Sequence, residues 1–122
     1  MGIIYKNLEI VGTKGKKKVN ILFDTGASRN FVREDIALSI AKPTEIPQTK
    51  IELGKGITEV KEMIGAVIKI NGYSLLTNFV IIPKLTEEAV LGAEFFQQWK
   101  IKLDPETEDI IIDPKYLQMK LI

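Results

Sequence analysis

The sequence predicts a mainly β domain with one or two short helices, and two features of the chain lead to this prediction. Short apolar segments follow one another through all 122 residues, and turn-forming Gly, Pro, Asn and Asp residues separate them at close intervals. The pair Asn71-Gly72 lies between two apolar segments and is a strong signal for a two-residue hairpin turn. No linker, repeat or low-complexity tract interrupts this pattern, so we expect residues 1–122 to form one domain.

The first third of the chain predicts strands joined by turns. Ile3–Val11 predicts a strand, and the glycines of Gly12–Lys16 favour a hairpin turn after it, because glycine adopts backbone conformations that other residues avoid. Val19–Phe23 is nearly all apolar and predicts a strand that is buried on both faces. The segment Asp24–Ser28 interrupts this pattern, and Phe31–Val32 resumes it.

The middle of the chain predicts a helix followed by a hairpin. Arg33–Ile40 predicts a short helix that ends before Pro43, because a residue that precedes proline is disfavoured in the helical conformation. Lys50–Leu53 and Val60–Ile70 predict two strands on either side of Gly54-Lys55-Gly56, which favours a turn.

The last third predicts short strands and a second helix. Ser74–Ile82 predicts a strand that Pro83 ends, and Ala89–Leu91 predicts a short apolar strand. Gly92–Lys100 predicts a helix whose three aromatic residues share one side, which is typical of packing on a core. Three further strands are expected at Ile101–Leu103, Ile110–Ile112 and Tyr116–Ile122.

The composition excludes several classes of function. The chain has no Cys and no His, so it can form no disulfide, no thiol nucleophile, no Cys/His zinc site and no Ser-His-Asp triad. An enzyme built from this chain must use carboxylates, Lys or Tyr for proton transfer. The 17 basic residues nearly balance the 16 acidic ones, which gives no reason to expect a nucleic-acid partner.

The sequence also lacks the features of a membrane or secreted protein. Its longest apolar runs are far shorter than the roughly 20 residues that span a bilayer, so we expect no membrane partner. The N-terminal residues lack the basic start, the apolar stretch and the cleavage site of a signal peptide, so we expect a cytoplasmic location.

The segment most informative about chemistry is Asp24-Thr25-Gly26-Ala27-Ser28, which directly follows an apolar strand. A carboxylate in such a place is costly unless it is paired or hydrogen-bonded. The Thr25 hydroxyl and the backbone N–H groups of a turn with Gly26 are suitable donors. Gly26 also allows the backbone to approach the carboxylate closely, and Ala27 and Ser28 leave room for a substrate. This segment is therefore the candidate active-site loop.

The chain resembles the retropepsin-like aspartic proteases, the single-domain relatives of pepsin. Asp24-Thr25-Gly26 matches the catalytic triplet of that family, and Ala27 matches its small fourth residue. Gly54-Lys55-Gly56 lies where the family has a Gly-bearing flap, and Ala89–Gly92 matches the second half of the family's internal pseudo-repeat. The resemblance extends from about Ile3 to Ile112 and implies a closed, barrel-like acid-protease fold.

The resemblance also implies an aspartic endopeptidase, with no cofactor and no metal, that acts on a peptide or protein substrate. Family members use two facing aspartates to activate a water molecule. The two groups share one proton, since like charges about 3 Å apart cannot both ionise, as is already known for aspartic-protease pairs. This chain has one Asp-Thr-Gly, and its other aspartates lie in no comparable loop. We therefore expect a symmetric homodimer with Asp24 of each copy at the two-fold axis.

The resemblance assigns further roles around Asp24. It implies that Thr25 holds the two active-site loops together across the dimer and that Gly26 contacts the substrate backbone. A flap is expected to close over an extended peptide, and its residues are Gly54, Lys55, Gly56 and Ile57. The candidate substrate-pocket residues are Ile82, Val90, Leu91 and Gly92.

The chain departs from retroviral members at two positions. Those enzymes carry a second Asp where this chain has Ser28, and an Arg where it has Ala93. Both members of a charge pair are therefore missing together, which makes the chain more similar to cellular and microbial relatives. We expect Arg29 and Glu94 to form a substitute ion pair. In the family the two termini interleave at the dimer interface, and the ends of this chain are apolar enough to do so.

Two other interpretations remain open from the sequence. The chain could be a catalytically weak peptide-binding or scaffold module with the same fold, because fold does not determine function. It could also be an unrelated β-barrel in which Asp24-Thr25-Gly26 is an ordinary turn. The last interpretation predicts a monomer with an exposed Asp24, whereas the protease interpretation predicts two Asp24 carboxylates around one water molecule.

Overall fold

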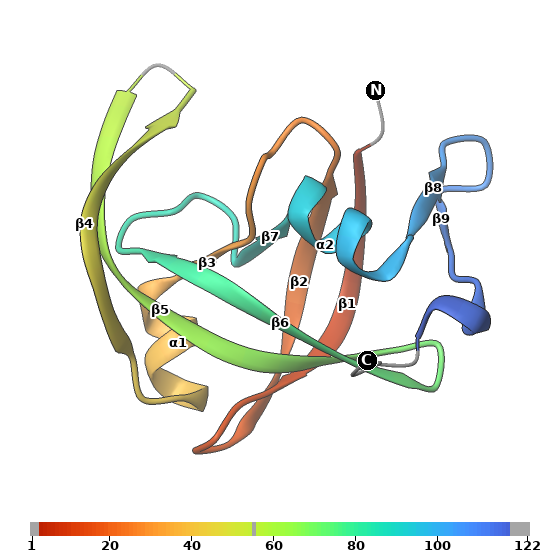
Figure 1. The fold of residues 1–122 in the computed structure, drawn as a ribbon, viewed down its shortest axis with the longest axis horizontal. Helices are drawn as coiled ribbons and strands as arrows, with labels where there is room; N and C mark the ends of the chain where they lie inside the picture. The colour runs from red at the N-terminus through yellow and green to blue at the C-terminus, as the bar shows by residue number, and fades with distance from the viewer. Residues whose placement is uncertain (1–2, 55, 118–122) are drawn as a thin grey trace, which may run out of the picture.

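The computed structural model describes residues 3–54 and 56–117, which form a barrel of strands with two short helices (Figure 1). The strands are β1 (Ile3–Val11), β2 (Lys16–Asp24), β3 (Phe31–Arg33), β4 (Thr44–Leu53), β5 (Gly56–Ile70), β6 (Tyr73–Ile82), β7 (Ala89–Leu91), β8 (Lys102–Asp104) and β9 (Asp109–Ile111). The helices are α1 (Glu34–Ile40) and α2 (Ala93–Trp99), and a 3-10 turn follows at Pro114–Tyr116. The expected mainly β fold with two short helices is confirmed.

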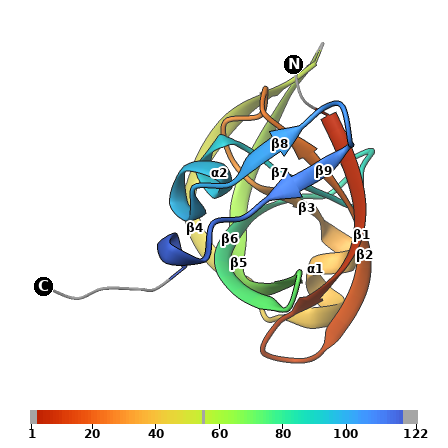
Figure 2. The same cartoon turned by 90° about the vertical axis from the view of Figure 1, so that its right-hand side faces the viewer.

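Seven strands form one sheet in the order β1-β2-β7-β3-β6-β5-β4. The sheet closes into a six-stranded barrel because β5 also pairs with β1, where Ile10 lies opposite Ile68 (Figure 2). Among the described strands, β4 pairs only with β5, and it lies outside the closed ring. Closure of the ring gives hydrogen-bond partners to backbone N–H and C=O groups that an open sheet would leave unpaired at its edges.

Two pairs of parallel strands determine where the candidate site forms. β2 is parallel to β7, with Leu22 opposite Val90, and β3 is parallel to β6. Because parallel strands end at the same edge of a sheet, the loop after β2 lies beside the start of α2, which follows β7. The loop with Asp24 and the start of α2 are therefore neighbours in space, although they are far apart in the sequence.

Two clusters of apolar side chains fill the fold. In the larger cluster the Phe23 ring contacts the rings of Phe95 and Phe96, at centroid distances of 6.4 and 6.3 Å. This confirms that the aromatic side of α2 packs on the core. The smaller cluster comprises Leu22, Phe31, Val60, Ile82 and Val90. Successive side chains of a strand point to opposite faces, so Leu22 and Phe23 place β2 in both clusters.

The hairpin of β4 and β5 is longer than the sequence predicted. β4 begins at Thr44 instead of Lys50, and β5 begins at Gly56 instead of Val60. Most residues of β4 are exposed, so the segment lacks the apolar alternation that predicts a strand. Pro47 also lies where the pairing with β5 shifts register, between Glu45 and Thr49, and proline is tolerated at such irregular edge positions.

The expected last strand, Tyr116–Ile122, is not formed where the structure describes it. Tyr116 lies in the 3-10 turn, which begins at Pro114 and in which the Asp113 side chain accepts a hydrogen bond from the Lys115 N–H. Residues 118–122 lie outside the described residues.

Helix α2 ends at a residue with a left-handed backbone. Lys100 has a φ of 54° and a ψ of 41°, and its N–H bonds to the carbonyl of Phe96. Non-glycine residues are strained in this conformation by about 1 kcal/mol. Lys100→Gly is therefore expected to raise the free energy of unfolding by about 0.5–1 kcal/mol in urea titrations.

The matched control is Lys102→Gly, which places the same substitution on strand β8. Because Lys102 has ordinary strand geometry, this glycine is expected to lower the free energy of unfolding. A loss of stability in Lys100→Gly as large as that in Lys102→Gly would contradict the assignment of backbone strain to Lys100.

Candidate active site

Asp24 is the last residue of β2 and begins a tight turn. Its Oδ1 accepts a hydrogen bond of 2.8 Å from the N–H of Gly26, and its carbonyl accepts one of 3.1 Å from the N–H of Ala27. A Cβ atom on residue 26 would lie 3.2 Å from Asp24 Oδ1, so glycine relieves crowding beside the carboxylate. Asp24 is partly exposed and Thr25 is exposed. The turn thus holds the Asp24 carboxylate at the surface.

The start of α2 is hydrogen-bonded to the residues that follow this turn. The carbonyl of Ala27 accepts a 2.7 Å hydrogen bond from the N–H of Ala93, and that of Ser28 accepts a 3.3 Å bond from Glu94. Gly92 lies so close that a Cβ atom there would be 2.5 Å from the carbonyl oxygens of both Ala27 and Arg29. Only glycine allows this approach. The glycine by which this segment resembles the family's pseudo-repeat, Gly92, therefore has a steric reason in this chain.

Asn30 fixes the end of the loop, and the sequence analysis did not identify it. Its side chain is buried, and its Nδ2 donates to Thr77 Oγ1 at 2.9 Å and to the carbonyl of Asn78 at 3.0 Å. Its Oδ1 accepts a 3.0 Å hydrogen bond from the Gly92 N–H. In a sequence, Asn usually indicates an exposed turn. The presence of Asn30 directly before Phe31 was therefore only a weak signal for a buried role.

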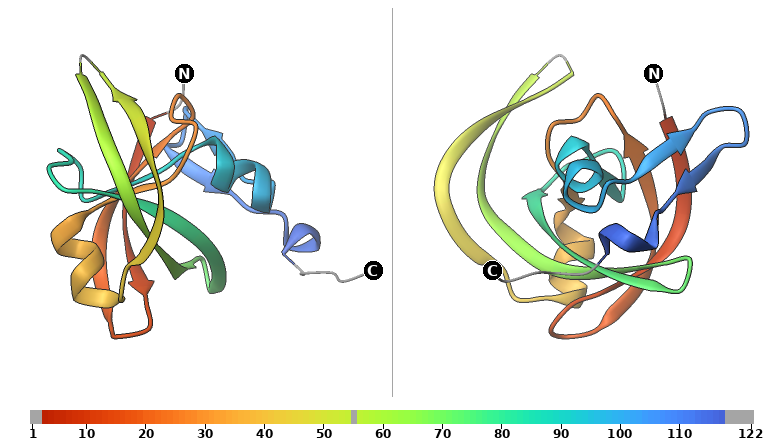
Figure 3. Two further views of the ribbon diagram at one scale, coloured as in Figure 1. Left: turned by 60° about the vertical axis from the view of Figure 1, so that its left-hand side comes forward. Right: turned by 45° about the vertical axis from the view of Figure 1, so that its right-hand side comes forward.

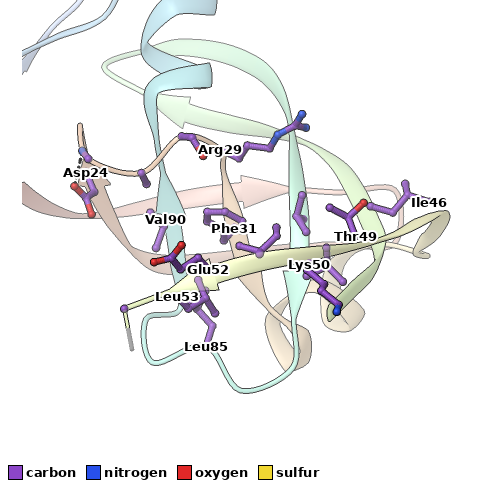
Figure 4. Close-up of a pocket in the computed structure, with 17 residues that line it drawn as sticks. Asp24, Arg29, Phe31, Ile46, Thr49, Lys50, Glu52, Leu53, Leu85 and Val90 are labelled. Atoms are coloured by element: carbon purple, nitrogen blue, oxygen red, sulfur yellow. Dashed lines mark hydrogen bonds between the residues drawn. The ribbon is translucent and has the colours of Figure 1, made fainter. Parts of the chain in front are cut away.

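A cavity of about 620 Å³ opens beside the turn (Figure 4). Six of the predicted site residues line it, namely Asp24, Gly26, Ala27, Ser28, Gly54 and Val90. Its apolar wall comes mainly from the smaller core cluster and its neighbours and includes Phe31, Ile51, Leu53, Val60, Val80 and Leu85. The cavity therefore combines one carboxylate-bearing loop with a surface suited to apolar side chains.

Of the four predicted pocket residues, only Val90 lines this cavity. Leu91 is fully buried in the larger core cluster, because it points to the opposite face of β7 from Val90. Ile82 is buried in the smaller cluster without lining the cavity, and Gly92 lies behind the loop. Of the four expected pocket residues, Val90 is therefore the one that lines this cavity, and contact of all four with a substrate stays a prediction.

Of the predicted flap residues, Gly54, Gly56 and Ile57 lie near the tip of the β4–β5 hairpin, which reaches beyond the barrel at the same end as the Asp24 loop (Figure 3). Gly54 lines the cavity, whereas Ile57 does not and is 72% exposed. Gly56 also lies outside the cavity lining, and Lys55 is outside the described residues. Residues of β4, among them Thr49, Ile51 and Leu53, also line the cavity, and the sequence analysis did not assign them to the site.

Two glutamates hold the segment that carries Leu85 against the barrel. The Tyr5 hydroxyl donates to Glu87 Oε1 at 3.0 Å, and the N–H of Asn20 donates to Glu88 Oε1 at 2.8 Å. The hydrogen bond to Glu87 raises the pKa of the Tyr5 hydroxyl. These contacts tie residues 83–88 to β1 and β2, and Leu85 thereby forms part of the cavity wall. Periodicity alone gave no signal for this arrangement.

The predicted ion pair between Arg29 and Glu94 is confirmed. Arg29 Nη1 lies 3.9 Å from Glu94 Oε2, and the two side chains are 63% and 43% exposed. An exposed pair at this distance contributes about 0–1 kcal/mol to stability. The pair is therefore a loose contact beside the loop and not a buried brace.

Over residues 3–54 and 56–117, we find no group of three or more acidic side chains arranged to hold a metal ion. In the same ranges no helix has the length and apolar character needed to cross a membrane.

The close approach of Gly92 to the loop leads to a prediction about stability. Gly92→Ala is expected to lower the free energy of unfolding by roughly 1–3 kcal/mol, because its Cβ would overlap two backbone carbonyl oxygens. Gly65→Ala on β5 is the control, since its Cβ would have its nearest contact at 3.4 Å. Urea titrations of both variants measure the effect, and equal stabilities would contradict the steric argument.

Comparison with known proteins places this site in a family. The model of the family described as "gag-polyprotein putative aspartyl protease" matches residues 10–98. A search of curated proteins finds no significant match. Among solved structures, the chain is similar to the crystal structure of the retroviral protease-like domain of Ddi1 from Leishmania major, with a TM-score of 0.67 over 93% of this chain and 90% of that chain.

The sequence identity to the Ddi1 domain is 14%, so this likeness concerns the fold alone. The family match covers most of the chain, including the Asp24 loop, β7 and most of α2. The chain therefore belongs to the gag-polyprotein aspartyl protease family and has the retropepsin-like fold.

Proposed function

We propose that this protein is an aspartic endopeptidase whose active site forms between two copies of the chain. The observation that carries the proposal is the placement of Asp24. Its carboxylate lies on a loop held by backbone hydrogen bonds, at the wall of a cavity lined by both apolar and polar residues. A carboxylate held in position beside a substrate-sized cavity is suited to general acid–base chemistry.

The need for a second copy follows from the number of suitable carboxylates. Within the described part of the cavity wall, the acidic residues are Asp24 and Glu52. Glu52 is exposed on β4, outside the closed barrel, and no hydrogen bond holds its side chain among the described residues. A symmetric dimer instead pairs Asp24 with its own copy, and the partial exposure of Asp24 is compatible with such pairing.

In the proposed reaction, the two Asp24 carboxyl groups share one proton. The ionised group removes a proton from a water molecule, and the oxygen of that water attacks the carbon of the scissile peptide bond. The protonated group donates a hydrogen bond to the carbonyl oxygen of the scissile bond as negative charge develops on that oxygen. The tetrahedral intermediate then collapses, the carbon–nitrogen bond breaks, and the leaving nitrogen takes up a proton from the carboxyl pair.

The hairpin and the cavity wall suit an extended peptide. Strand β4 has no partner on its outer edge among the described strands, and its residues line the cavity next to the Asp24 loop. A peptide bound there as an extended segment would form main-chain hydrogen bonds and place alternate side chains in the cavity. The proposed flap, around Gly54–Ile57, would then cover the peptide and exclude water.

A second function remains compatible with the fold: a peptide-binding or scaffold module with little catalytic activity. It shares the cavity with the protease proposal but does not require a water molecule between two carboxylates. The two functions are separated by substitutions that remove a single negative charge from the same cavity.

Asp24→Asn is expected to lower kcat/KM for peptide cleavage by about 10²–10⁴-fold, because an amide cannot accept the proton from water. Glu52→Gln removes the other cavity carboxylate and is expected to lower kcat/KM less than about tenfold, since Glu52 takes no part in proton transfer. Both are measured with an internally quenched peptide library at acidic and neutral pH.

The two variants distinguish three mechanisms. A large loss in Glu52→Gln as well would indicate an Asp24–Glu52 pair within one chain and would contradict the dimeric site. Cleavage that persists unchanged in Asp24→Asn would contradict aspartic catalysis. Peptide binding without cleavage by the wild type would support the scaffold module.

The dimeric site also predicts that activity depends on protein concentration. Below the dimer dissociation constant, specific activity is expected to fall in proportion to protein concentration, because each monomer holds half of the catalytic pair. Progress curves over a dilution series, with sedimentation velocity on the same samples, measure both quantities. Full specific activity in samples that sediment as monomers would contradict the proposal.

A further inference from the structure

Arg29 occupies a distinctive place in the cavity wall. It lines the cavity with Asp24 and also two adjoining hollows, one bounded by α2 and the other by β4 and β6. In Figure 4 the Arg29 side chain extends from the loop past Phe31, on the side away from Asp24. Arg29 therefore places a positive charge where the cavity continues beyond the reaction centre.

The Arg29 guanidinium has donors available for a ligand. Its contact with Glu94, at 3.9 Å, is longer than a hydrogen bond, and the structure gives this group no hydrogen bond to any residue in the ranges it describes. Because both side chains are largely exposed, the pair is weak. A substrate carboxylate that meets the guanidinium in a bidentate geometry would form shorter, stronger hydrogen bonds than Glu94 does.

The other charged residues of the cavity do not duplicate this role. Lys50 and Glu52 of β4 also line the cavity, but both are exposed, and in Figure 4 the Lys50 side chain points away from Arg29. Arg29, by contrast, belongs to the loop that carries Asp24. Arg29 is therefore the cation best placed to contact a side chain of a peptide that lies across Asp24.

The surroundings of Arg29 are apolar on the cavity side. Phe31 and Val80 line the cavity next to it, and Ile46 contributes to both the cavity and the adjoining hollow. A side chain that fits here would place methylene groups on an apolar surface and a charged end at the guanidinium. Glutamate and aspartate within an apolar sequence have this chemistry.

We propose that Arg29 makes this cavity selective for peptides that carry an acidic side chain close to apolar residues. This inference rests on the proposed peptidase function and adds a substrate class to it. In the proposed symmetric dimer each copy contributes one Arg29, so the acidic preference applies on both sides of the scissile bond.

The test uses sets of internally quenched peptides that are identical except for Glu, Gln or Lys at one position, scanned across an apolar sequence. The wild type is expected to cleave the best Glu peptide with a kcat/KM about tenfold above its Gln counterpart. Arg29→Gln is expected to bring this ratio close to one, and Arg29→Glu to favour the Lys peptide. Addition of 0.5 M NaCl is expected to reduce the wild-type ratio, because salt screens an exposed charge.

Lys42→Gln is the matched control, since it removes a positive charge at an exposed position that lines none of the three hollows. This variant is expected to keep the wild-type Glu-to-Gln ratio. An unchanged ratio in Arg29→Gln, or an equal loss in Lys42→Gln, would overturn the assignment to Arg29. Urea titration of each variant verifies that the proteins are folded.

The outcomes separate this inference from the proposed function. Equal cleavage of Glu and Gln peptides by the wild type would overturn the acidic preference and leave the peptidase proposal standing. If no peptide is cleaved, the peptidase proposal fails, and the same peptides are tested for binding by fluorescence anisotropy. Tighter binding of Glu peptides that Arg29→Gln abolishes would then support the role of Arg29, whereas equal binding or no binding would overturn it.

Discussion

The close packing of Gly92 against the backbone of the Asp24 loop is the contact on which the site depends. Since β2 and β7 are parallel, the loop after one strand meets the helix start after the other. The absence of a side chain at Gly92 lets the carbonyls of Ala27 and Ser28 bond to the first N–H groups of α2. Asn30 completes the arrangement through the Gly92 N–H and the carbonyl of Asn78. The position of Asp24 is thus a consequence of strand direction and of one missing side chain.

This arrangement leaves one carboxylate on a hydrogen-bonded loop, beside a cavity with both apolar and polar walls. The smaller core cluster, to which Leu22 and Val90 belong, is continuous with the wall of that cavity. Packing of the barrel and shape of the cavity are therefore linked, and changes in this cluster affect both. Where retroviral relatives carry an Asp and an Arg, this chain has Ser28 and Ala93, and the loose Arg29–Glu94 pair lies at the surface beside them. The loop is held mainly by backbone hydrogen bonds, which leaves Arg29 available for substrate recognition.

Much of the fold followed from local patterns in the sequence. The hairpin at Asn71-Gly72 was predictable because both residues adopt positive φ, at 48° and 82°. The Asp24 loop was recognisable because a carboxylate directly after an apolar strand requires an explanation. Closure of the barrel was not predictable from periodicity, since it depends on pairing between β1 and β5, which are distant in sequence. The buried role of Asn30 was not predictable from the sequence either. Whether Val90 or Leu91 lines the cavity depends on which face of the strand meets it, and a continuous apolar run does not indicate that face.

The central claim is that two chains share one active site, and the stoichiometry of a statine-type transition-state analogue tests it most directly. Native mass spectrometry of the protein with this inhibitor, together with a calorimetric titration, counts the inhibitors bound per chain. The account predicts a complex of two chains and one inhibitor, because both Asp24 carboxylates contact the same inhibitor hydroxyl. A complex of one chain with one inhibitor, formed by a protein that cleaves peptides, would contradict it.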